Sequence, residues 1–123
     1  MTNAQHAFNA YSEQAAPIKT DRSLEYDVVA RVTSNLKAAT HKEADYSNLV
    51  TVIDDNRRMW SLIASSVGDT ENQFPPELKA RLFYLYEFTL LHSRKVLKGD
   101  ADIHPLVDIN LAILRGLNQG SQS

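Results

Sequence analysis

The chain contains four histidines, the side chains best suited to acid–base catalysis or metal binding near neutral pH. Their positions are His6, His41, His92 and His104. No two are spaced so that a helix would bring both to one face as metal ligands. Asp54 and Asp55 are adjacent, so on a helix they point in different directions and do not form an acid/base pair. Glycine-rich phosphate loops and common hydrolase motifs are absent as well. We therefore expect no enzyme activity, no metal and no cofactor.

The adjacent pair Arg57-Arg58 is the next candidate, because two arginines can contact RNA phosphates. On a helix, however, Asp54 and Asp55 lie within reach of this pair and would offset its charge. The whole chain has a formal net charge of -2 and a pI near 6.0, which provides no general attraction for a polyanion. The sequence favours a solvated face or ion pairing over direct nucleic-acid binding.

Two asparagines, Asn56 and Asn110, interrupt apolar stripes at positions where an aliphatic residue would be expected. A polar group in such a stripe needs a hydrogen-bond partner. One interpretation is that the two amides bond to each other, to a helix end or to buried water, and so fix the register of a bundle. The other is that they face a groove and bind an incoming segment. The only tryptophan, Trp60, has the same two interpretations, as a core anchor or as a contact for a partner.

The apolar residues around these side chains recur at steps of three and four, which is typical of amphipathic helices. Caps and prolines predict helix boundaries. The predicted helices span 3–16, about 21–40 with Thr20 or Asp21 as its cap, about 45–66, about 76–98, and about 105–117. The sequence thus predicts an all-α fold, a bundle of four to five helices.

The fourth predicted helix has apolar residues over more than half of its circumference, so we expect it to be central. The first either docks on the bundle or stays mobile. Gly116 and Gly120 predict the end of the last helix, followed by a disordered tail at 118–123.

At 123 residues the chain is expected to form a single domain, 1–123. Disulfides and cysteine-ligated zinc are excluded because there is no cysteine. No run approaches the roughly 20 apolar residues of a membrane span, and no secretion signal is visible. We expect a cytoplasmic protein without membrane insertion.

Three motifs in order, Asn56-Arg57-Arg58-Met59-Trp60, Pro75-Pro76-Glu77-Leu78 and the segment from Asp108 to Leu117, resemble the FlaF family. This family comprises flagellar biosynthesis regulatory proteins of α-proteobacteria. The resemblance covers most of the chain. It implies a small cytoplasmic protein without enzyme activity or cofactor, which acts in flagellin production and export beside the translation regulator FlbT.

The resemblance further implies a secretion chaperone that binds flagellin, whose amphipathic ends need their apolar face covered before assembly. An apolar groove, covered in the free protein by the helix around Phe8 and Tyr11, would suit this role. The alternative is a post-transcriptional regulator of flagellin mRNA that acts with FlbT. A structural dimer is a third interpretation. The expected partner-binding residues are Asn56, Arg57, Trp60, Asn110 and Arg115.

Overall fold

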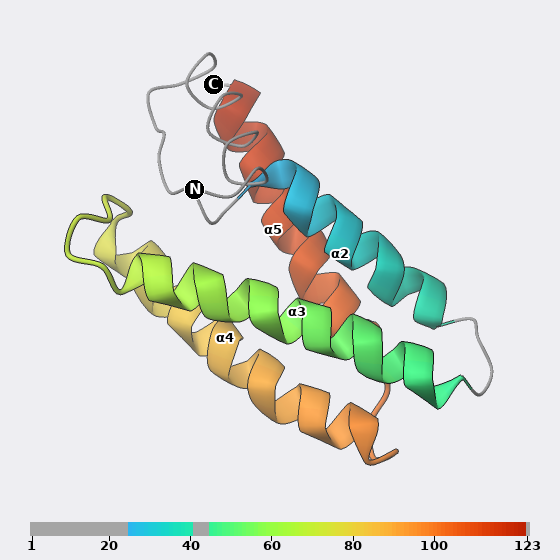
Figure 1. Cartoon of the computed structure of the whole chain (residues 1–123). Helices are drawn as coiled ribbons and strands as arrows, with labels where there is room; N and C mark the ends of the chain where they lie inside the picture. Colours follow the sequence, from blue (N-terminus) through green and yellow to red (C-terminus); the bar gives the residue numbers. More distant parts are fainter. Residues whose placement is uncertain (1–24, 41–44, 123) are drawn as a thin grey trace.

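The computed structural model describes residues 25–40 and 45–122, with side chains as far as Leu117. This part of the chain forms four helices and no strand (Figure 1). The helices are α2 (Tyr26–Ala39), α3 (Tyr46–Val67), α4 (Pro76–Leu97) and α5 (His104–Gln122). The prediction of an all-α bundle is confirmed. The helix predicted at 3–16 lies outside the described residues.

Helix α3 packs against both α2 and α4, and α2 packs against α5. Helices α4 and α5 meet much less extensively, while α3 and α5 do not pack along their backbones. In the bundle, α3 and α5 are therefore diagonal partners, and the seam between α4 and α5 is the least closed of the four. Figure 1 shows α3 and α4 side by side, with α2 and α5 forming the other pair.

The helix boundaries follow from local side-chain chemistry. Asp45 caps α3, since its Oδ1 accepts from the backbone N–H of Asn48 at 3.1 Å. Pro76 opens α4, where its missing N–H costs no hydrogen bond. Gly99 ends α4 with a φ of 82°, a left-handed conformation that suits glycine. The N–H of Gly99 and that of Asp100 then donate to the carbonyls of Val96 and Lys95, which satisfies the open end of the helix.

Two predicted boundaries were wrong. Helix α2 begins at Tyr26 rather than near Asp21, because the backbone of Glu25 is extended, with φ −100° and ψ 129°, and no helix continues through it. Helix α5 runs through Gly116 and Gly120 to Gln122, past the end predicted near Leu117. A glycine ends a helix by adopting positive φ, and among the described glycines only Gly99 does so.

The prediction that the fourth helix is central was also wrong, because α3 occupies that position. Helix α3 buries seven side chains, whereas α4 buries four: Leu82, Thr89, Ser93 and Val96. Helix α4 lies at the edge of the bundle and packs mainly on α3. Only one of its faces therefore contributes side chains to the core. Of its other apolar residues, Leu85, Tyr86 and Leu97 pack partly buried against the core. Four are exposed at the surface: Leu78, Phe83, Tyr84 and Leu91.

Candidate functional site

The side chains of Asn56, Trp60 and Asn110 form a hydrogen-bonded chain in the core. The indole Nε1–H of Trp60 donates to Oδ1 of Asn110 at 3.0 Å, and Nδ2–H of Asn110 donates to Oδ1 of Asn56 at 2.8 Å. All three residues have 0% of their surface exposed. Asn110 comes from α5 and the other two from α3, so these bonds join the diagonal pair whose backbones do not pack together.

The indole nitrogen determines the direction of this chain, because it can only donate. It therefore requires the oxygen of Asn110 on its side, which leaves the amide nitrogen of Asn110 to face Asn56. Of the two interpretations of the asparagines, mutual bonding is the one found. In this structure none of the three side chains reaches the surface, so each can act on a partner only by positioning its helix.

The two predicted arginines lie nearer to solvent. The side chain of Arg57 is 29% exposed and lies 3.7 Å from Asp54, and Arg58 lies 3.3 Å from the same carboxylate. The interpretation of the Arg57-Arg58 pair as ion-paired is thereby confirmed. Arg115 is exposed on α5. Of the five residues predicted to bind a partner, only these two arginines, Arg57 and Arg115, are accessible.

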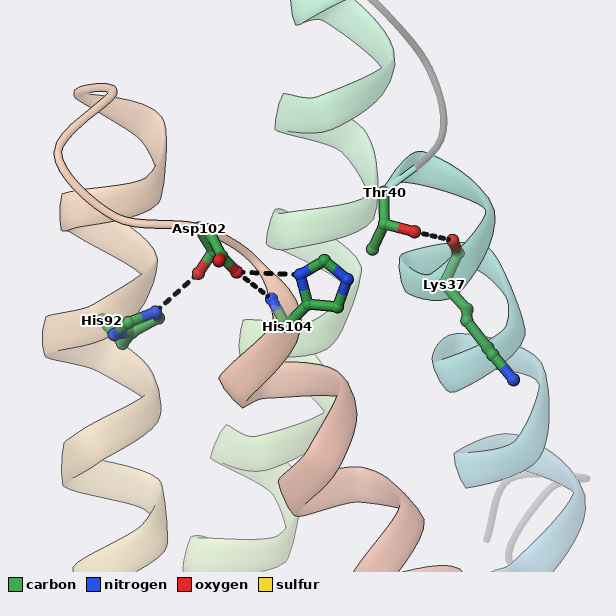
Figure 2. A network of polar contacts seen from close by, with 5 residues as sticks. All are labelled: Lys37, Thr40, His92, Asp102 and His104. Atoms are coloured by element: carbon green, nitrogen blue, oxygen red, sulfur yellow. Dashed lines mark hydrogen bonds and ion pairs between the residues drawn. The ribbon is translucent and has the colours of Figure 1, made fainter.

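A second polar cluster joins the end of α4 to the start of α5 (Figure 2). The Nε2–H of His92 donates to the carbonyl of Asp102 at 2.8 Å. Oδ1 of Asp102 accepts from the backbone N–H of His104 at 2.7 Å and from its ring Nδ1–H at 3.0 Å. These bonds from His104, the backbone one first, lower the pKa of the exposed Asp102 carboxyl. The arrangement caps α5 and is structural.

In residues 25–40 and 45–122, no three His, Asp or Glu side chains gather to hold a metal ion. An open hollow of about 400 Å³ lies between α2 and α3, lined by Asn35, Ala38, Asp45, Asn48, Thr51, Val52 and Asp55. About half of its lining surface is apolar, but it contains no aromatic or other large apolar side chain that could anchor a helix.

The surface best suited to an apolar partner is the outer face of α4. Tyr84 is 65% exposed and Leu91 is 55% exposed, and half-buried Phe88 lies between them. Steps of four and three residues place these three side chains in one line along the helix. The ring of Phe88 also stacks on His92, with 5.2 Å between ring centroids.

Sequence reasoning missed this surface because it assigned all apolar residues of the fourth helix to the core. The signal was present, since that helix has more apolar circumference than one edge of a small bundle can bury.

Comparison with known families identifies the chain. The sequence model of the family described as "Flagellar protein FlaF" matches residues 7–117. The chain belongs to the FlaF family. A flagellar role follows from this membership. The matched range includes Asn56, Trp60 and Asn110, so two of the three motifs that carry the resemblance meet in the core of the bundle.

Neither the comparison with curated proteins nor that with solved structures gives a match. Within the described residues, no helix of this FlaF protein is both long and apolar enough to cross a bilayer.

Proposed function

We propose that this FlaF protein is a cytoplasmic export chaperone that covers an amphipathic terminal helix of flagellin, and that it acts by binding rather than by catalysis. The observation that carries the proposal is the line of Tyr84, Phe88 and Leu91 on α4, at the surface of a protein with a flagellar role. Residues at i, i+4 and i+7 are the usual anchors when one helix docks along another.

The energetics of this surface suit reversible capture. Burying a large apolar side chain fully contributes about 1.5–3 kcal/mol. Tyr84 and Leu91 are already partly covered by their own helix, so each would contribute less than that on docking. Two or three such anchors must also offset the entropy of association. A contact of this size can be released again when the partner enters the export apparatus.

The residues predicted from the sequence have different roles in this proposal. Asn56, Trp60 and Asn110 hold α3 and α5 in register and so fix the frame against which α4 packs. Arg57 and Arg115 are accessible and remain candidate partner contacts. The proposal places the main contact on α4 instead.

The test is a calorimetric titration of the full chain with synthetic peptides that cover the two terminal helices of flagellin. Leu91→Ala should weaken binding by at least about fivefold, because it removes an anchor. Leu62→Ala is a matched control, since Leu62 on α3 is 54% exposed and lies on a different helix. No saturable binding to either peptide would overturn the proposal, as would equal losses in the two variants.

The alternative, a post-transcriptional regulator of flagellin mRNA acting with FlbT, is favoured by one observation. Helix α4 and the residue after it carry five Lys or Arg residues and two Glu residues, although the whole chain is acidic. Phosphate contacts would make RNA affinity fall steeply with salt. A leader transcript of flagellin mRNA should then bind the purified protein in a salt-dependent way. Binding only after FlbT is added would favour an indirect role.

A further inference from the structure

The apolar line on α4 continues at both ends into basic residues. Arg81 precedes Tyr84 by three positions, while Lys95 and Lys98 follow Leu91 by four and seven. We call this line the outer seam: Arg81, Tyr84, Phe88, Leu91, Lys95 and Lys98. Its steps of three and four repeat every seven residues, the spacing with which two helices pack along each other. The same steps lead back from Arg81 to the exposed Glu77, four residues earlier. The seam therefore has an apolar centre flanked by three cations, with one acidic residue at its N-terminal limit.

Within residues 25–40 and 45–117, none of these cations forms an ion pair. The ion pairs formed between described residues lie elsewhere, with Arg57 and Arg58 at Asp54 and His104 at Asp102. The helix dipole accounts for Lys95 and Lys98 near the C-terminal end of α4, but it gives no reason for Arg81 in the N-terminal half. The acidic residues nearby on this helix are Glu77, one turn before Arg81, and Glu87, which flanks the seam.

A second copy of the chain complements this pattern only in part. In an antiparallel pair of seams centred on Phe88, Arg81 would lie opposite Lys95 of the other copy, twice, although Glu77 would lie near Lys98. In a parallel pair in register, each cation would face its own equivalent. Like charges placed opposite each other oppose association. With three cations and one acidic residue along its line, the seam is matched better by a partner with acidic ends than by a second copy of itself.

We propose that the outer seam selects a flagellin helix with acidic residues at both ends of its apolar stripe, about two heptads apart. Acidic residues opposite Arg81 and Lys95 would pair with them, and apolar residues would cover Tyr84, Phe88 and Leu91. This inference rests on the proposed chaperone function and adds the chemistry that decides which segment binds. Exposed charge pairs contribute little affinity each, so their main effect is selection and faster association.

The test uses the flagellin terminal peptide that binds the full chain best, and the double variant Arg81→Glu/Lys95→Glu. This variant should bind about tenfold more weakly, because two attractions become repulsions. Changing the acidic residues that bracket the peptide's apolar stripe to lysine should restore binding to the variant and weaken binding to the native chain. Circular dichroism would check that the variant remains helical.

The matched control is Arg31→Glu/Lys37→Glu, which changes net charge equally at exposed positions of α2. It should change affinity by less than about twofold. Equal weakening by both double variants, or a lack of rescue by the charge-swapped peptide, would overturn the inference. If Leu91→Ala weakens binding while the charge variants do not, the inference fails and the proposed function stands. If no flagellin peptide binds, both fail.

Discussion

Asn56 and Asn110, 54 residues apart in the chain, are joined by a 2.8 Å amide hydrogen bond inside the bundle. Because their helices do not pack along their backbones, this bond and the one from Trp60 connect α3 to α5 by side chains. Both bonds depend on one side chain. Asn110 supplies the acceptor for the indole and the donor for Asn56.

Replacing Asn110 should therefore be costly. Asn110→Ala leaves the indole N–H of Trp60 and the oxygen of Asn56 buried without their partner, and it opens a small cavity. We expect the free energy of unfolding to fall by about 2–4 kcal/mol. Urea denaturation, monitored by circular dichroism, measures this free energy of unfolding. Asn35→Ala, at an exposed position of α2, should change it by less than about 0.5 kcal/mol. A loss below about 1 kcal/mol for Asn110→Ala would contradict a structural role for the bonds.

The outer seam should tolerate truncation without loss of stability. Tyr84→Ala and Leu91→Ala remove side chains that are more than half exposed, so each should change the free energy of unfolding by less than about 1 kcal/mol. Leu82→Ala, on the buried face of the same helix, should cost about 2–5 kcal/mol. The comparison uses thermal and urea unfolding. Equal costs for Leu82→Ala and Leu91→Ala would place the seam in the core and remove it as a docking surface.

The two glycines Gly99 and Gly116 should respond to alanine in opposite directions. Gly99 has positive φ, so Gly99→Ala should lower the free energy of unfolding by about 1 kcal/mol or more. A Cβ at Gly116 meets nothing within 4 Å, and the position is inside a helix, so Gly116→Ala should raise it by about 0.5–1 kcal/mol. The melting temperature should fall for Gly99→Ala and rise for Gly116→Ala. A stabilised Gly99→Ala variant would be inconsistent with the left-handed end of α4.

The contact between Asp102 and His104 should make stability depend on pH in acid. Bonds from His104 lower the pKa of Asp102 below its ordinary 3.8, so the ionised carboxylate stabilises the folded state above the unfolded pKa. This stabilisation is lost as the pH falls through the lowered pKa. Asp102→Asn should therefore be less stable than the native chain at pH 6, with a difference that shrinks below about pH 4. Urea midpoints at several pH values measure it. A constant difference across that range would contradict this assignment.

The sequence was sufficient to predict the fold class because amphipathic periodicity reports directly on helices. It also predicted the local ends of α3 and α4, where Asp45, Pro76 and Gly99 act through their own backbone neighbours. The start of α2 was missed because a side chain that can cap a helix does not have to cap one. The position of α4 was missed because apolar content does not show which face the neighbouring helices cover.

For the site, the pattern identified the amides but not their depth. An asparagine in an apolar stripe has the same sequence signature whether it meets another buried amide or lines a groove. Only the packing of α3, α2 and α5 places Asn56 and Asn110 in contact. The outer seam could have been recognised from the seven-residue spacing of Tyr84, Leu91 and Lys98, but its exposure depends on which face of α4 meets α3.

The burial of Trp60 also makes this residue an intrinsic fluorescence probe of the core. It is the only tryptophan of the chain, it is fully buried, and its indole is bonded to Asn110. Its fluorescence reports on the integrity of the core, whereas a partner along the outer seam would contact α4 without touching it. If the emission wavelength stays unchanged when a ligand binds, the core around Trp60 has remained intact. A red shift on binding would show that the bound partner exposes Trp60 to solvent. One fluorescence titration therefore distinguishes docking on α4 from opening of the core.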